Sequence, residues 1–300
     1  MNGELCGILV MNKPEGFTSF DVIGKLRGIL HMKRLGHTGT LDPMATGVLP
    51  VLAGTATRAC DILPDETKTY RADFQLGRVT DTQDSTGTVL ETHPFQHVTR
   101  EDILALLPRF TGVLRQIPPM YSAVQVNGKR LYELARAGRE IERPARTVQV
   151  ERFDLLSFDE NTGAGSAEIV CGKGTYVRTL LHDLGQALGC GCCMTALTRT
   201  AACGFSIADA YTFEQVQQAA GSGAAASLLI PADRLFTVFP ALHLNTVQTQ
   251  KYRCGVKLSL SRLHGITADD RYRVYAEDGR FLGLADADRS DGCLRIFKNL

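Results

Sequence analysis

The 300-residue sequence lacks tryptophan and has almost no net charge, with 33 lysines and arginines against 32 aspartates and glutamates. It has no apolar run near the roughly 20 residues of a membrane-spanning helix. Glu4 precedes the first apolar stretch, where a secretory signal would carry basic residues. These absences predict a cytoplasmic globular protein with no membrane partner. The balanced charge by itself does not indicate a nucleic-acid partner.

Cysteine spacings typical of a metal site or a disulfide framework are also missing. The nine cysteines are an odd number spread over a long chain, which favours reduced thiols. Cys190, Cys192 and Cys193 form a cluster, with Cys203 further along, but the cluster contains no paired CxxC motif. Adjacent residues of a strand point to opposite faces. We therefore interpret these cysteines as small buried apolar residues and predict no metal ion.

Hydrophobic periodicity and capping signals predict the helices and strands. Thr18 caps a helix to Leu30 that includes Phe20 among its apolar positions, and Thr99 with Asp102 opens a helix to residue 110. Further helices are predicted at residues 131–137 and 174–188, and strands at residues 7–12, 48–53, 69–76, 121–126, 147–153, 167–171 and 194–200. Residues 32–47 are predicted to be a loop, and residues 88–91 a hairpin partner of the strand at 69–76.

The order of these elements predicts the fold class. Strands and helices interleave without a regular βαβ alternation, which favours an α+β fold with a mixed or antiparallel sheet. After Pro231, short strand-like runs at 271–276, 281–287 and 294–297 are separated by turns, as in a small β domain. We therefore expect a catalytic domain at residues 1–235 and a small C-terminal β domain at residues 236–300.

The segment Gly36–Gly47, GHTGTLDPMATG, combines several glycines with the side chains of His37, Thr38, Thr40 and Asp42. A loop of this kind can bring backbone and functional groups close to a ligand. On composition alone, a structural turn with an aspartate before a proline is the better interpretation.

At this segment the sequence resembles the TruB family of tRNA pseudouridine synthases, whose signature GHxGxLDPxAxGxLP it matches from Gly36 to Pro50. The resemblance continues through NKPEGFTS, KTYRADFQLG, TDTQDSTG, PPMYSAVQVNGKRLYELAR, GTYVRTLLHDLG and LTRT, and it covers residues 5 to 235 almost continuously. It implies a catalytic domain with a mixed sheet and, as in many members, a C-terminal domain of the PUA type. The implied activity is that of a tRNA pseudouridine-55 synthase, an isomerase acting on a uridine of the T arm.

This isomerisation breaks the bond between ribose C1′ and uracil N1 and joins C1′ to C5, without water or an external group. Glycoside hydrolases need a second carboxylate, whereas this reaction needs one. The resemblance places the catalytic aspartate at Asp42, which either attacks C1′ or removes a 2′ proton. It also implies that Arg178 keeps Asp42 ionised, and that Tyr70 stacks on the target base and helps to move the C5 proton.

The remaining site residues are expected to hold the RNA, whose target base must be flipped out. By resemblance, Leu197 closes the pocket on the base, Tyr176 lines it, and His37 fills the vacated space. Lys13 is expected to position either the nearby loop or a phosphate. Without the resemblance, each would have an ordinary structural interpretation.

Lys129 and Arg130 belong to a basic segment at residues 127–152 that also contains glutamates. A solvated helix with ion pairs explains such a segment as well as RNA binding does. The resemblance implies an RNA-clamping insertion at about residues 120–150, with Gln125 where many relatives have lysine. A second basic set in the tail fits either contact with the acceptor stem or simple solubility; it comprises Lys251, Arg253, Lys257, Arg262, Arg271 and Arg273.

Two other functions are weighed against the synthase. An RNA-binding or RNA-folding protein would not need Asp42, Tyr70 and Arg178 together. A nucleosidase or glycosidase would need a second carboxylate, and neither Asp81 nor Asp84 lies in a signature for one. We therefore expect an enzyme that acts as a monomer on tRNA, with no cofactor and no obligate protein partner, and that also assists tRNA folding.

Overall fold

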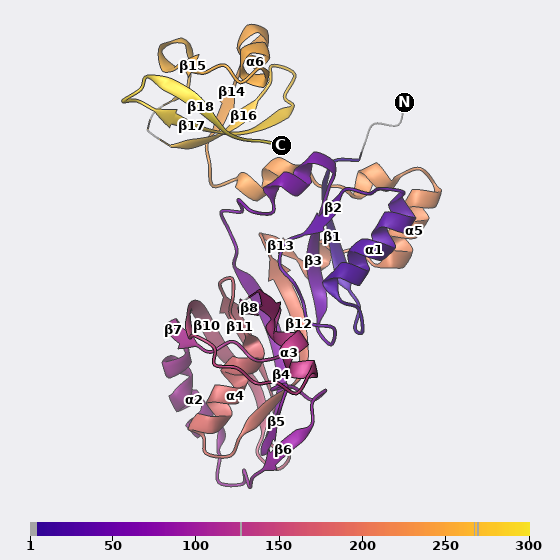
Figure 1. Cartoon of the computed structure of the whole chain (residues 1–300), viewed down its shortest axis with the longest axis vertical. Helices are drawn as coiled ribbons and strands as arrows, with labels where there is room; N and C mark the ends of the chain where they lie inside the picture. The colour runs from indigo at the N-terminus through magenta and orange to yellow at the C-terminus, as the bar shows by residue number, and fades with distance from the viewer. Residues whose placement is uncertain (1–4, 127, 267, 269) are drawn as a thin grey trace.

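The computed structural model describes residues 5–126, 128–266, 268 and 270–300. It contains a nine-stranded sheet and a separate five-stranded sheet formed by the C-terminal part of the chain (Figure 1). Helices lie among the strands without a regular βαβ repeat. This arrangement confirms the predicted α+β class.

The nine-stranded sheet is mixed, because β3 and β12 are parallel while its other neighbouring pairs are antiparallel. Its main path runs β1 (Gly7–Lys13), β3 (Thr46–Ala53), β12 (Cys192–Ala202), β4 (Lys68–Leu76), β11 (Ala164–Cys171), β10 (Arg146–Asp159) and β7 (Gly112–Gln116). Two short strands join it at the sides, β2 (Leu35–His37) on β3 and β13 (Phe205–Ser206) on β12.

The parallel junction places the predicted functional loop against the middle of the sheet. Thr46 and Gly47 pair with Thr198 and Arg199, and Arg199 also pairs with Tyr70 of β4. Gly47 has a φ of 100°, and a Cβ added there would lie 2.2 Å from the carbonyl oxygen of Arg199. Only glycine therefore allows β3 to approach β12 this closely.

Helices cover both ends of this sheet (Figure 1). One end carries α1 (Ser19–Leu30) with α5 (Phe213–Gly221), and the other carries α2 (Arg100–Leu106) with α4 (Val177–Ala187). The predicted capping boxes at the starts of α1 and α2 are present. The α1 core face holds Val22, Ile23 and Leu26, whereas Phe20 is 70% exposed, so its assignment to that face was wrong.

Several predicted elements differ because tertiary pairing decides them. The expected loop at 32–47 is interrupted by β2 and ends where β3 begins. β6 (Val89–Thr92) pairs with β5 (Arg78–Thr80) rather than with β4, whose two edges are taken by β12 and β11. The strand predicted at 121–126 is reduced to β8 (Gln125–Val126), which pairs with β9 (Lys129–Arg130) before α3 (Leu131–Arg136). Strand β7 was not predicted, and α4 begins at Val177 rather than at 174.

The C-terminal sheet has its own core and confirms the predicted small β domain. Its order is β14 (Ala241–His243), β16 (Arg271–Tyr275), β17 (Phe281–Asp288), β18 (Cys293–Asn299) and β15 (Leu258–Ser259), with α6 (Thr246–Arg253) beside it. Phe236 stacks on Phe281, and the Tyr275 hydroxyl donates to Asp233 at 2.8 Å, so the preceding segment packs against this sheet. The PUA type and the division after residue 235 stay predictions.

The cysteine cluster is buried, as predicted: Cys190, Cys192 and Cys193 are each at most 2% exposed. Burial raises the pKa of all three thiols, that of Cys192 most strongly. The described residues contain no group of three or more histidine, cysteine or acidic side chains placed to hold a metal ion. Within the same part of the chain, no helix is long and apolar enough to cross a membrane. Glu4 and Asn127, used above, lie outside the described residues.

Candidate active site

Asp42 stands in the loop between β2 and β3, and hydrogen bonds fix this loop on both sides of it. The Ser19 hydroxyl, at the start of α1, accepts from the Leu41 N–H at 2.8 Å. On the other side, the Gly16 N–H donates to the Pro43 carbonyl at 2.8 Å. The Asp42 side chain is 37% exposed. The loop therefore holds a carboxylate in a fixed place while leaving it accessible to a substrate.

Lys13, at the end of β1, is the third anchor of this loop. Its side chain is fully buried, and its Nζ donates to the carbonyls of Pro14, Phe17 and Pro43 at 2.6–3.2 Å. Burial lowers the pKa of Lys13 to about 8, against the opposing attraction of Asp42. Lys13 was expected to position either the loop or a phosphate. In the structure its ammonium contacts the loop through the Pro43 carbonyl, and it is too deeply buried to reach a phosphate.

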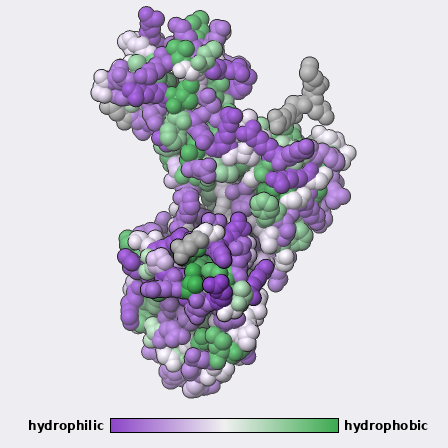
Figure 2. Space-filling view, in the orientation of Figure 1, coloured by the Kyte–Doolittle hydropathy of each residue, from purple (hydrophilic) through white to green (hydrophobic). Residues whose placement is uncertain are grey.

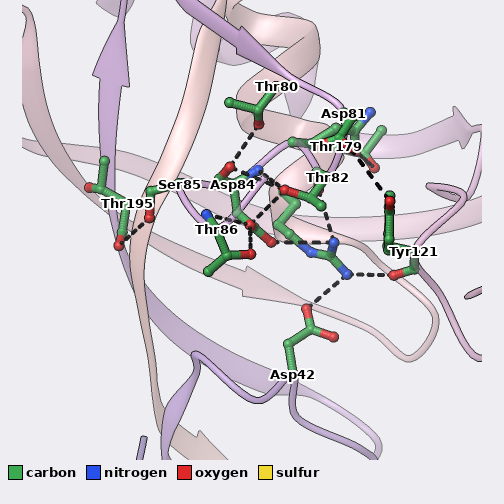
Figure 3. A network of polar contacts seen from close by, with 12 residues as sticks. Asp42, Thr80, Asp81, Thr82, Asp84, Ser85, Thr86, Tyr121, Thr179 and Thr195 are labelled. Carbon is green, nitrogen blue, oxygen red and sulfur yellow. Dashed lines mark hydrogen bonds and ion pairs between the residues drawn. The ribbon is translucent and has the colours of Figure 1, made fainter. Parts of the chain in front are cut away.

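Arg178, on α4, joins three segments around its guanidinium, which is only 4% exposed (Figure 3). Nη2 contacts the Asp42 carboxylate at 2.9 Å and the Tyr121 carbonyl at 2.9 Å. Nη1 contacts the Thr82 carbonyl at 2.9 Å and the Asp84 carboxylate at 3.4 Å. We call these five residues the Arg178 network. The predicted Asp42–Arg178 pair is thus present, and the guanidinium orients the Asp42 carboxylate.

Asp84 is a member of this network that sequence reasoning did not assign. It is 4% exposed and accepts hydrogen bonds from the hydroxyls of Thr82 and Thr86 and from the Thr86 N–H at 2.6–3.0 Å. Its acceptor capacity is used inside the protein, and it meets Nη1 of the guanidinium whose Nη2 contacts Asp42 (Figure 3). The available signal was the run TDTQDSTG, whose closely spaced hydroxyls and carboxylates are typical of a hydrogen-bonded turn.

Tyr70 and Leu197 lie together at the apolar side of the site. Both are 7% exposed and belong to one cluster of buried residues with Leu41, the neighbour of Asp42 in the loop. Burial raises the pKa of Tyr70 to about 12, against the opposing effect of the Arg199 cation, so the phenol is protonated at neutral pH. The structure therefore brings these two predicted residues into one buried cluster with Leu41 of the Gly36–Gly47 loop.

Tyr176 caps α4, two residues before Arg178. The side chain of Gln116, on β7, accepts from the Tyr176 N–H at 2.8 Å and donates to its carbonyl at 3.0 Å. Gln116 is 3% exposed and was not singled out in the sequence. This two-way contact fixes the start of the helix that presents Arg178, while burial raises the pKa of the Tyr176 hydroxyl.

His37 is the last residue of β2 and pairs with Val51 of β3, so it lies in a strand within the segment predicted to be a loop. The ring is half-buried, and burial with the charge of Arg199 lowers its pKa, which favours the neutral ring. Its Nδ1 is buried without a hydrogen-bond partner.

Arg199 is, like Lys13, a fully buried cation near the loop, and no pattern in the sequence singled it out. It is 0% exposed, and it donates from Nε to the Val48 carbonyl at 2.6 Å and from Nη2 to the Gly39 carbonyl at 3.2 Å. Among the described residues it has no carboxylate partner, and its Nη1 has no hydrogen-bond partner at all. Arg199 belongs to the LTRT motif, but the residues around it in the sequence do not indicate that its side chain is buried.

Lys129 and Arg130 are exposed on β9. The segment that carries them has its own small core around Met120, Leu131 and Leu134. Figure 2 shows that the viewed face of the molecule is mostly hydrophilic, with separate small apolar patches. The insertion is thus a folded unit with basic side chains on its surface.

The fold is shared with chains of solved complexes. The chain matches a chain of the "Cbf5-Nop10-Gar1 Complex" with a TM-score of 0.71 and 24% identity, covering 94% of this chain and 78% of that one. It matches a chain of an "H/ACA RNP bound to a substrate RNA containing 2'-deoxyuridine" with a TM-score of 0.73 and 20% identity, covering 98% and 85%. At these identities the matches establish the fold alone.

Sequence comparisons identify the family. Residues 27–177 match the model of the "TruB family pseudouridylate synthase (N terminal domain)", and residues 178–237 match the "tRNA pseudouridylate synthase B C-terminal domain". Similar relatives are the tRNA pseudouridine synthase B of Acaryochloris marina, 42% identical over 97% of each chain, and that of Bacillus cytotoxicus, 44% identical over 98% of this chain and 92% of the relative. The fold and these matches define the protein as a pseudouridylate synthase, an isomerase. The chain belongs to the TruB family.

Proposed function

We propose that the protein converts a uridine in the T arm of tRNA, at position 55, to pseudouridine, with Asp42 as its only catalytic carboxylate. Its relatives bear the name tRNA pseudouridine synthase B, which supports tRNA as the substrate. In the proposed reaction the C1′–N1 bond of the nucleotide breaks, the detached base turns, and C1′ joins C5. The proton displaced from C5 leaves to solvent and one is gained at N1, so no co-reactant is needed.

The observation that carries this proposal is the unequal availability of two carboxylates around one guanidinium. Asp42 has a 37% exposed side chain, whereas that of Asp84 is 5% exposed and has hydrogen-bond donors around it. A hydrolase would need a second accessible carboxylate to activate water. One accessible and one buried carboxylate fit an isomerase, in which Arg178 orients Asp42 toward the substrate.

Tyr70 and Leu197 are the residues proposed to hold the flipped uridine. Tyr70 offers a ring to stack on the base, and Leu197 closes the pocket beside it. Base flipping costs a few kcal/mol, which such stacking and phosphate contacts offset. His37, neutral and at the edge of the site, is the proposed residue that fills the vacated stack. Lys129 and Arg130, exposed on the insertion, are proposed to bind RNA phosphates.

A tritium-release assay tests the proposed reaction. Unmodified tRNA transcript labelled with tritium at uridine C5 should release label with the wild-type protein alone, because C5 exchanges its hydrogen for the bond to C1′. The Asp42→Asn variant should release none while still binding the transcript. Equal release by both proteins would overturn the role of Asp42.

The proposed RNA clamp has a separate test in salt dependence. Affinity for tRNA should fall linearly on a log–log plot against salt, and replacing Lys129 by glutamine should lower the slope by about one contacted phosphate. An unchanged slope would remove Lys129 from the interface. The proposed role in tRNA folding predicts that Asp42→Asn still accelerates refolding of misfolded transcript, since that role needs binding without chemistry.

A further inference from the structure

Three cations surround the catalytic loop without any carboxylate partner among the described residues. Lys13 and Arg199 are 0% exposed, and Lys68, at the start of β4, is half-buried. All three donate to backbone carbonyls; the Nζ of Lys68 donates to that of Glu66 at 2.6 Å, while the Glu66 carboxylate is paired with Lys173. We call Lys13, Lys68 and Arg199 the Gly39 cation group. Buried cations are costly unless an anion compensates them.

Two members of this group converge on Gly39, in the middle of the catalytic loop. A Cβ built on Gly39 would lie 3.2 Å from Cε and 4.0 Å from Nζ of Lys68, and 3.8 Å from Nη1 of Arg199. That Nη1 is the buried atom that has no hydrogen-bond partner. Gly39 has a φ of 84°, a conformation that favours glycine. The exposed backbone of Gly39 therefore lies close to one ammonium nitrogen, of Lys68, and one guanidinium nitrogen, of Arg199.

We propose that a phosphodiester flanking the target uridine binds over Gly39, hydrogen-bonded to Lys68 Nζ and held by the charge of Arg199 beneath. Among the described residues, the half-buried Lys68 ammonium donates one hydrogen bond, to the Glu66 carbonyl, so it has further N–H donors for an incoming oxygen. Arg199 is enclosed, so it contributes through its charge rather than by touching the RNA. The inference rests on the proposed function, because it needs RNA as the substrate.

The position of Gly39 explains why a flanking phosphate is the group that reaches it. If His37 fills the vacated stack and Asp42 reaches C1′ of the flipped nucleotide, the backbone of that nucleotide must pass between these two residues. Gly39 lies between them along the loop. The phosphodiester that links the stacked neighbour to the flipped nucleotide therefore crosses the segment under which Lys68 and Arg199 lie.

The test uses T-arm hairpin RNA in which a single phosphodiester is replaced by a neutral methylphosphonate. The replacement is made 5′ of the target uridine, 3′ of it, or at a control linkage in the stem. Binding is measured with full-length Asp42→Asn protein, so that the RNA is not turned over, with and without Lys68→Gln. Lys33→Gln, at an exposed lysine elsewhere, is the matched control.

One flanking methylphosphonate should weaken binding roughly tenfold, and Lys68→Gln should weaken binding of unmodified RNA by a similar factor. Combined, the two changes should cost no more than either alone, because both remove the same contact. Lys68→Arg should restore most of the affinity, which separates charge from folding. Lys33→Gln and the control linkage should have little effect.

The phosphate site would be overturned if, at both flanking linkages, the losses of affinity caused by the methylphosphonate and by Lys68→Gln multiplied when the two were combined. It would also be overturned if Lys68→Gln left the affinity for unmodified RNA unchanged. These outcomes leave the proposed function intact if wild-type protein still forms pseudouridine in the unmodified hairpin. A wild-type protein that bound the hairpin but formed no pseudouridine would instead overturn the proposed function. The phosphate site would then be judged by the binding data alone.

Discussion

The two buried arginines on either side of the catalytic loop are paired in opposite ways. Arg178 contacts two carboxylates and two carbonyls, whereas Arg199 contacts two carbonyls and leaves Nη1 without a partner. Arg178 is 4% exposed and Arg199 is 0% exposed, so burial does not account for the difference.

The difference separates a charge that is satisfied within the protein from one that is not. In the Arg178 network, the protein itself supplies the anions, and the guanidinium orients one of them for chemistry. In the Gly39 cation group, the hydrogen-bond acceptors are backbone carbonyls and no carboxylate of the described residues forms an ion pair with the cations, so an incoming anion gains more there. Single substitutions in the two regions should therefore have different effects.

The largest loss of stability is expected for Arg178→Met. Removing the guanidinium leaves Asp84 buried without its ion partner, which should lower the free energy of unfolding by about 3–5 kcal/mol. Activity should fall by more than about 1,000-fold, because Asp42 loses its orienting contact as well. Urea denaturation and tritium release measure the two effects. A stability loss below that of Arg199→Met would contradict the comparison.

Arg199→Met should cost less, about 1–3 kcal/mol, although Arg199 is the more deeply buried residue. The change leaves only the carbonyls of Val48 and Gly39 without donors and also removes an uncompensated buried charge. Urea denaturation under the same conditions measures it. The variant should bind tRNA with a weaker dependence on salt than the wild type.

Lys13, a member of the Gly39 cation group, should make the free energy of unfolding depend on pH. Folded Lys13 loses its proton near pH 8, whereas the unfolded chain keeps it up to 10.5. Between these values the unfolded state binds more protons, so stability rises with pH. Relative to Lys13→Met, the wild type should gain about 1–2 kcal/mol between about pH 7 and about pH 9.5. A flat difference would show that the folded lysine is not desolvated.

Gly39→Ala should have the smallest effect on stability, about 1 kcal/mol, because alanine adopts a positive φ with strain. Its new methyl group would press on the Lys68 side chain, so affinity for RNA should fall more than stability does. Gly28→Ala, on α1 with open space around it, is the matched control and should leave RNA binding unchanged. Equal binding by both variants would contradict a phosphate over Gly39.

Local signals in the sequence were sufficient for much of the scaffold. Thr18 and Thr99 cap their helices, because capping depends on residues three positions apart. Alternation along residues 69–76 predicted β4 closely. The neighbour of residues 88–91 was predicted wrongly, since both edges of β4 are taken by strands distant in the sequence.

For the site, the sequence by itself determined the loop motif, and its resemblance to the TruB family predicted roles for Asp42, Arg178, Tyr70 and Leu197, because these residues lie in motifs with fixed local spacing. Only the tertiary structure decided that Lys13 is enclosed, that Asp84 stands behind Arg178, and that Arg199 reaches Gly39, 160 positions away. The physical reason is that burial and charge compensation depend on partners brought together by the sheet. No local pattern encodes those partners.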